Sequence, residues 1–293
     1  MIDFILAHAV GGLLACFRAL PPNWCVALGR GFGALAAILK IRSGILMKNL
    51  EIVFPEHTPE ERRTMARAVY ISFGTFLGEW LSFRARGPQG VADMIRCDFP
   101  EIIDTAFAEG KGLVFYTAHF GNWELAGWYI AKHAAPFSAV LNSLKNPWLD
   151  RMFEKLHEES GIGTIYKGGS IPKIHEVLNR GGSVGMLADQ NAGRKGVFID
   201  FLGRPASFHR GPVMISIEKR CPLICIIPVP EAPGKWVLEC RRIEPRSTGN
   251  LEADVSAMVS DYARLVEDAI RRHPQHWFWF HNRWKTRPRK DAS

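Results

Sequence analysis

Cysteines are few in this sequence, and none of them stands in a pattern typical of a disulfide framework or a zinc site. Six cysteines are scattered over 293 residues, mostly within apolar runs. A disulfide framework needs closely spaced cysteines in a short chain, and a structural zinc site needs paired ligands of the CxxC type. We therefore expect reduced core cysteines in a protein that faces the cytoplasm, with no metal and no cofactor.

Long, clean apolar runs are also missing. Residues 4–17 are uncharged and apolar, and residues 24–41 form a second run that Arg30 and several glycines interrupt. Neither run has the ~20 consecutive apolar residues of a membrane span, and Asp3 stands where a signal peptide carries basic residues. A short membrane anchor and an ordinary buried helix are both open, and we favour the anchor. We thus predict a membrane-anchoring helical segment at 1–42 and one domain at 43–293.

Acidic side chains are outnumbered by basic ones. Lys and Arg total 37 against 29 Asp and Glu, which gives a formal charge of +8. This excess favours anionic partners such as nucleic acid, phospholipid or anionic glycolipid. Because no nucleic-acid-binding motif accompanies the charge, we expect a membrane surface as partner and no nucleic acid. The tryptophans fit contact with lipid headgroups, although they fit a protein core equally well.

From about residue 100 the sequence alternates between stretches typical of strands and of helices. Helices are predicted at 101–109, 122–133, 148–159, 171–179 and 251–272, and strands at 112–118, 137–141, 163–166, 183–188, 197–201, 222–229 and 235–243. Upstream, Thr58 and Glu61 form a capping box that opens an amphipathic helix, and residues 84–100 form a linker. This order predicts an α/β protein with a mixed, mainly parallel sheet flanked by helices, whose late strands are antiparallel.

The segment GLVFYTAHFGNWE carries the residues with the clearest chemistry. His119 follows a buried strand and Glu124 lies in the first turn of the next helix, which is where open α/β sheets bind ligands. We predict that His119 is a general base and that Glu124 orients its ring, although a structural histidine is the alternative. Gly121 permits a tight turn and Asn122 caps the helix, whose first N–H groups can stabilise an oxyanion. No serine nucleophile is needed, because the hydroxyl of an acceptor can attack directly.

Two other functions compete with this hypothesis. A serine hydrolase is suggested by Gly181–Gly185, which matches G-x-S-x-G. A nucleophile elbow requires strand, serine and helix in that order, whereas here a predicted helix precedes and a strand follows. A non-catalytic, membrane-associated lipid-binding protein explains the N-terminal runs and the tryptophans, but it does not explain a histidine and a carboxylate at a strand end.

Five motifs in order resemble the late acyltransferases of lipid A biosynthesis, which are lauroyl and myristoyl transferases of the bacterial inner membrane. They are KNLEIVFPE, HFGNWE (the H-x4-D/E box), KNPWLD, DQNAGRKGVFIDFLGRPASFHRGP and PQHWFWFHNRWK. The resemblance implies a fold of the glycerol-3-phosphate acyltransferase type. It implies an acyl thioester donor, on acyl carrier protein or coenzyme A, and a hydroxyl of a lipid A precursor or related glycolipid as acceptor. A lysophospholipid or another membrane lipid is the alternative acceptor. The implied location is the cytoplasmic face of the inner membrane.

The sequence departs from this family at two positions. The family usually has arginine four residues before its Asn-Pro dipeptide, where this chain has Asn142, and a second arginine where it has His157. We expect Lys145 and Lys167 to supply the lost positive charge.

A later segment adds further candidates for binding. Asp189 and Gln190 end another predicted strand, and we expect them to bind substrate or organise the site, a turn-forming aspartate being equally open. Arg204 and Arg210 follow in a basic cluster that suits anionic headgroups, with a solvated surface as the plainer explanation.

Overall fold

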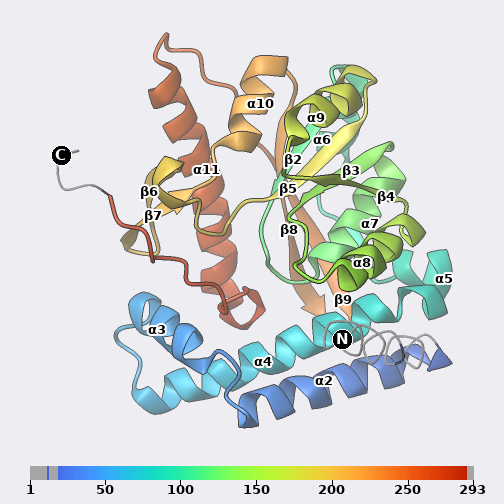
Figure 1. Cartoon of the computed structure of the whole chain (residues 1–293), viewed down its shortest axis with the longest axis vertical. Coiled ribbons are helices and arrows are strands. Elements are labelled where there is room, and N and C mark those ends of the chain that lie inside the picture. The colour runs from blue at the N-terminus through green and yellow to red at the C-terminus, as the bar shows by residue number, and fades with distance from the viewer. Residues whose placement is uncertain (1–11, 13–18, 289–293) are drawn as a thin grey trace.

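A central sheet with helices on both faces forms the main body of the protein (Figure 1). This computed structural model describes residue 12 and residues 19–288, so the apolar run at 4–17 lies mostly outside the described residues. The sheet has seven strands in the order β1-β9-β8-β2-β5-β3-β4. Their bounds are β1 Ile95–Cys97, β2 Leu113–Thr117, β3 Phe137–Leu141, β4 Ile162–Tyr166, β5 Ser183–Leu187, β8 Leu223–Ala232 and β9 Lys235–Arg242.

Neighbouring strands of this sheet are parallel except β8 and β9, which are antiparallel. The prediction of a mixed, mainly parallel α/β sheet is therefore confirmed. All five residues of β2 are buried, as expected of a strand that is covered on both faces. The central strand that leads to His119 thus has a fixed position and direction.

Two groups of helices cover the two faces. One face packs against α9 (Ser170–Asn179), α10 (Gly211–Lys219) and α11 (Leu251–Arg272). The other face packs against α6 (Pro100–Ala108), α7 (Trp123–His133) and α8 (Pro147–Glu159). The core is split accordingly, because alternate residues of β2 point into opposite clusters.

Several elements were not predicted from the sequence. Residues 84–100 were expected to be a linker but contain most of α5, Phe83–Ala92, and β1. Gly87, with φ of +64°, and Pro88 break α5 into two turns, which explains why helical periodicity was not evident. The short helices α3 (Ser43–Val53) and α10 were also missed. So was strand β7 (Arg204–Phe208), which forms a hairpin with β6 (Val197–Phe201).

The helices α2, Pro22–Ile38, and α4, Pro59–Leu81, lie side by side below the sheet in Figure 1. Their backbones approach closely at glycines, since a Cβ on Gly29 or Gly74 would collide with a carbonyl oxygen of the other helix. Thr58 caps α4 with Glu61 in the predicted capping box. Within the described residues no single helix is long and apolar enough to span a membrane, although α2 and α3 together meet those criteria across an 88° bend.

Candidate active site

Four neighbouring parallel strands each place a polar residue just beyond their carboxyl ends. His119 follows β2, Asn142 follows β3, Lys167 follows β4 and Gln190 follows β5. Because the carboxyl ends of parallel strands lie at the same edge of a sheet, these residues converge. All four line one cavity of about 410 Å³. Further polar residues in its wall are Asn191 and His209.

Asp189 holds the ring of His119. Its Oδ1 lies 2.7 Å from His119 Nδ1 and accepts a second hydrogen bond, of 3.1 Å, from the backbone N–H of His119. Its Oδ2 accepts a 2.8 Å hydrogen bond from the indole N–H of Trp277. Both carboxylate oxygens are therefore engaged, and Nε2 of His119 is the ring nitrogen left for the cavity, where Gln190 Nε2 lies 3.5 Å away.

The electrostatics of this pair suit a general base. Burial raises the pKa of Asp189, but the charge of His119 and the hydrogen bonds from His119 and Trp277 outweigh it and bring the pKa to about 2. Asp189 is therefore a carboxylate at neutral pH. A carboxylate at Nδ1 fixes the tautomer in which Nε2 can accept a proton, and it stabilises the imidazolium that forms.

Glu124 does not occupy the position that the sequence suggested. Its Oε2 lies 2.9 Å from Nε2 of His157, and its Oε1 accepts a 3.1 Å hydrogen bond from Trp123. The neighbouring strand β5 brings Asp189 to His119, while α8 brings His157 to Glu124, so the carboxylate on Nδ1 comes from another strand and not from the helix that follows. Glu124 is linked to His119 through Trp123, whose ring packs edge-on against the His119 ring with 5.4 Å between ring centroids. Its part in catalysis stays a prediction.

Gly121 and Asn122 shape the loop between β2 and α7. Gly121 has φ of +56°, and a Cβ there would collide with the carbonyl oxygen of Pro228. The Asn122 side chain caps α7 by accepting a 3.0 Å hydrogen bond from the N–H of Leu125, and it donates one of 2.8 Å to the buried Glu79. The predicted turn and cap are confirmed, and contact of these two residues with substrate stays a prediction.

Of the four basic residues expected to bind substrate, Lys167 alone lines the cavity. Its pKa is lowered by burial. Lys145 is exposed before α8, Arg204 is exposed at the start of β7, and Arg210 forms a 2.6 Å ion pair with Glu252. A role for these three in binding an extended substrate outside the cavity stays a prediction.

A segment distant in sequence braces the loop that carries His119. The N–H of Gly121 donates a 2.9 Å hydrogen bond to the carbonyl of His276, and the N–H of Phe278 donates one of 2.9 Å to the carbonyl of His119. Between them lies Trp277, the residue that reaches Asp189. The aromatic segment at residues 274–284, which we call the strap, is therefore part of the site.

Sequence reasoning missed Trp277 and Arg283, and it did not foresee that Asp189 is the partner of His119. Arg283 is buried, donates a 2.7 Å hydrogen bond to the carbonyl of Ser207 and lies 4.1 Å from the centroid of the Phe208 ring. Burial lowers its pKa to about 10, with the charge of Asp189 opposing the shift. The only signal in the sequence was the aromatic and basic composition of the strap, and composition does not predict that the strap contacts the His119 loop.

A second, apolar cavity adjoins the first. It measures about 40 Å³ and lies between the sheet and α7, with Phe115, Ile130, Phe137, Ile162 and Ile226 among its lining residues. Leu141 and Leu187 line both cavities, and Glu124 and His157 lie in the wall of the apolar one. The polar side chains of the first cavity thus border directly on an apolar interior.

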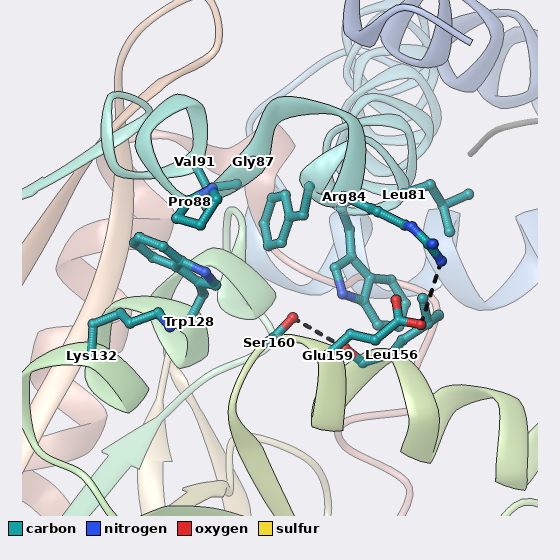
Figure 2. A pocket seen from close by; sticks show the side chains of 12 residues that line it. Leu81, Arg84, Gly87, Pro88, Val91, Trp128, Lys132, Leu156, Glu159 and Ser160 are labelled. Atoms are coloured by element: carbon teal, nitrogen blue, oxygen red, sulfur yellow. Dashed lines mark hydrogen bonds and ion pairs between the residues drawn. The ribbon is translucent and has the colours of Figure 1, made fainter. Parts of the chain in front are cut away.

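The cavity in Figure 2 is separate from both. It measures about 380 Å³ and is lined by residues of α4, α5, α7 and α8, including Trp80, Trp128 and Leu156. Arg84 and Glu159 form an ion pair of 3.8 Å beside it. None of the residues predicted for catalysis lines it.

Comparison with known proteins assigns the family. The family described as bacterial lipid A biosynthesis acyltransferase matches residues 2–286 of the chain. This protein belongs to that family. The predictions that it is an enzyme and that it transfers acyl groups to a lipid acceptor are therefore confirmed.

Individual members of this family align with nearly the whole chain. The chain is similar to the lipid A biosynthesis palmitoleoyltransferase of Escherichia coli, at 26% identity over 291 residues, 96% of this chain and 92% of that protein. It is similar to the lauroyltransferase of the same species, at 26% identity over 94% of this chain and 90% of that protein. The phosphatidylinositol mannoside acyltransferase of Mycolicibacterium smegmatis is 24% identical over 95% of this chain and 90% of that protein.

Proposed function

We propose that this acyltransferase moves a fatty acyl chain from an acyl thioester, on acyl carrier protein or coenzyme A, to a hydroxyl of a lipid A precursor or a related glycolipid. The observation that carries the proposal is the His119–Asp189 pair in a polar cavity that shares a wall with an apolar one. The relatives are named for lipid A biosynthesis and for acyl transfer to phosphatidylinositol mannoside, and both of these lipids are glycolipids. A cavity with amides and a lysine beside the base suits such a polar head.

In the proposed mechanism, Nε2 of His119 takes the proton of the acceptor hydroxyl as the oxygen attacks the thioester carbonyl. Asp189 stabilises the imidazolium that forms. The tetrahedral intermediate then collapses, the carbon–sulfur bond breaks, and the imidazolium returns its proton to the leaving thiolate. One thioester and one hydroxyl thus give one ester and one thiol, and no covalent enzyme intermediate is needed.

Lys167 is the residue we assign to charge stabilisation in the cavity. The attack creates an oxyanion, and a partly desolvated ammonium nearby favours that charge more strongly than one in bulk water. The N–H groups of α7 expected for this task are partly engaged, because Leu125 donates its N–H to the Asn122 cap. Asn142, which lines the same cavity, offers an amide donor in place of the family's usual arginine.

Glu124 has a positioning role in this proposal. It holds the Trp123 indole through a 3.1 Å hydrogen bond, and that indole packs against the His119 ring. It also pairs with His157 at the wall of the apolar cavity. Loss of Glu124 therefore disturbs the base through Trp123 and leaves a buried histidine without its partner.

The apolar cavity is where we place the acyl chain. Its walls are formed by α7 and the buried strands, and it meets the polar cavity at Leu141 and Leu187, so a chain lying in it directs its thioester carbonyl toward His119. A cavity of about 40 Å³ is too small to hold a fatty acyl chain. Side chains such as Phe137 must therefore move as the acyl chain is bound.

We also propose that the protein works at the cytoplasmic face of the inner membrane, with α2 against the lipid. The outer face of α2 presents Trp24, Leu28, Phe32 and Leu35, which are 39% to 62% exposed. Their spacing places them on one side of the helix, opposite the glycines that contact α4. The exposed Lys40 and Arg42 follow and suit anionic lipid headgroups.

Catalysis is tested with a radiolabelled acyl-thioester donor and a lipid A precursor in mixed micelles. We expect His119→Ala to reduce kcat by ~100-fold or more, and Glu124→Ala to reduce it as well, with both proteins retaining the circular dichroism of the parent. Full activity of the His119→Ala protein would refute the mechanism. Full activity of Glu124→Ala would remove the positioning role alone.

The acceptor is tested by mass spectrometry of lipids from cells with and without the gene. Loss of one acyl chain from a glycolipid supports the proposal. A change confined to phospholipids would favour the alternative, an acyltransferase that acts on a lysophospholipid or another membrane lipid. Unchanged lipids together with retained vesicle binding would favour a non-catalytic lipid-binding protein.

A further inference from the structure

Two cysteines outside the active site lie against each other at one edge of the sheet. Cys97 ends β1, Cys240 lies in β9, and their Sγ atoms are 3.2 Å apart. The strands are parallel neighbours in which Cys97 is paired with Leu238. Cys240 is two residues further along β9, so it lies on the same face as Leu238 and its thiol meets that of Cys97 diagonally. The pair is thus placed by the regular register of two strands.

The two thiols differ in access and acidity. Cys240 is completely buried, whereas Cys97 is partly exposed. The hydrogen bond with Cys240 lowers the pKa of Cys97 in spite of burial, while that bond and burial raise the pKa of Cys240. Because the thiolate is the reactive form, Cys97 is the thiol that meets an oxidant and Cys240 is the one placed to resolve it.

A metal site is the competing explanation, because Asp98 supplies a third donor atom near the two sulfurs. Its oxygens are already engaged, however. Oδ1 accepts a 2.9 Å hydrogen bond from the N–H of Cys240, and Oδ2 forms a 2.9 Å contact with the guanidinium of Arg241. Two thiolates on one tetrahedral zinc ion, with Zn–S of ~2.3 Å, lie about 3.8 Å apart. The observed 3.2 Å is shorter and favours a direct sulfur–sulfur bond.

We propose that Cys97 and Cys240 form a reversible intramolecular disulfide on oxidation by a peroxide. The Cys97 thiolate attacks one peroxide oxygen, the O–O bond breaks, and Cys97 becomes a sulfenic acid with release of water or an alcohol. The Cys240 thiol then attacks the Cys97 sulfur, the sulfur–sulfur bond forms and the sulfenic oxygen leaves as water. The two thiols lose two electrons in total and the peroxide gains them. The sulfurs must approach from 3.2 Å to ~2.05 Å, a movement within reach of side-chain rotation.

The disulfide would link β1 covalently to β9, the strand that also contacts the network beneath the active-site loop. On the same face of β9, the Trp236 indole donates a 3.1 Å hydrogen bond to Glu79, which in turn accepts one from the Asn122 cap. The bond therefore ties the edge of the sheet to the strand that braces this buried network.

Thiol mapping on the full-length purified protein tests the proposal. The protein is treated with hydrogen peroxide, free thiols are blocked with N-ethylmaleimide under denaturing conditions, and peptides are analysed by mass spectrometry with and without dithiothreitol. We expect a cross-linked peptide pair containing Cys97 and Cys240, which dithiothreitol separates. Cys97→Ser and Cys240→Ser should each abolish it, whereas Cys221→Ser, a substitution of another buried cysteine, should keep it.

Several results would overturn the proposal. Full labelling of both thiols by N-ethylmaleimide after peroxide treatment would refute it. Conversion of Cys97 to a sulfinic acid while Cys240 stays a free thiol would also refute it. Protection of both thiols from maleimide by stoichiometric zinc, reversed by a chelator, would assign a metal site instead. Because these readouts use the unsubstituted protein, they hold even if a serine variant fails to fold.

Discussion

Asp189 is the carboxylate that lies against Nδ1 of His119. Asp189→Asn removes the negative charge and no longer fixes the tautomer of His119, and we expect kcat to fall by ~100-fold or more with a smaller change in KM. The control is Asp200→Asn, on the exposed face of β6. Steady-state kinetics with the thioester donor measure both variants. An Asp189→Asn protein with parental kcat would show that the hydrogen bond at Nδ1 is incidental.

His157 makes stability depend on pH in a defined direction. Burial lowers its pKa, but the hydrogen bond and the charge of Glu124 outweigh burial and raise it above 6.5. A raised histidine pKa contributes stability that is fully present below the unfolded pKa and is lost as pH rises through the folded pKa. His157→Gln should therefore reduce the free energy of unfolding by about 2 kcal/mol at pH 6 and by less at pH 9.

Urea unfolding at the two pH values measures this effect, with His133→Gln on the exposed part of α7 as control. An equal loss at both values would mean that His157 is neutral in the folded protein.

At this scale the sequence singled out His119 but not Asp189, the carboxylate that lies against its ring. His119 was recognisable because a histidine between a buried strand and a helix cap has local signals. The hydrogen bond between His119 and Asp189 depends on the pairing of β2 with β5. The spacing of residues within either segment does not predict which strands are neighbours in the sheet.

Among the elements, α2 and α4 are joined by an unusually close backbone approach. Gly29 and Gly33 on α2 face Gly74 and Gly78 on α4, and a Cβ at any of them would collide with the opposite backbone. We expect Gly74→Val to lower the free energy of unfolding by ~1 to 3 kcal/mol through overpacking and to speed trypsin cleavage after the exposed Arg42. Gly44→Ala is the control, because a Cβ there meets nothing within 4 Å. Thermal unfolding and limited proteolysis report the result, and an unchanged Gly74→Val protein would contradict the contact.

The sequence predicted elements well where periodicity was long and capped. The capping box at Thr58 and the caps at Asn122 and Asn250 marked the starts of helices that the structure confirms. It failed where a helix carries its own breaker, as α5 does at Gly87 and Pro88, and where proline sits in a strand, as Pro205 does in β7. The proposed boundary after residue 42 stays a prediction.

For the molecule as a whole, the strap connects remote parts of the chain into one site. Trp277→Phe keeps the aromatic packing but removes the hydrogen bond to the buried Asp189 carboxylate, and we expect kcat to fall by about 10- to 100-fold. Trp284→Phe is a matched control, because the Trp284 indole N–H is buried without a hydrogen-bond partner in the described part of the chain. Equal activity of the two variants would show that the strap contributes packing alone.

The position of the strap late in the chain has a consequence for synthesis. A ribosome releases residues 119 and 189 well before it releases residues 276–278, yet the loop at His119 takes its backbone partners from that later segment. A nascent chain that ends before the strap therefore lacks the two hydrogen bonds that hold the His119 loop. We therefore expect fragments that end before residue 276 to lack acyltransferase activity.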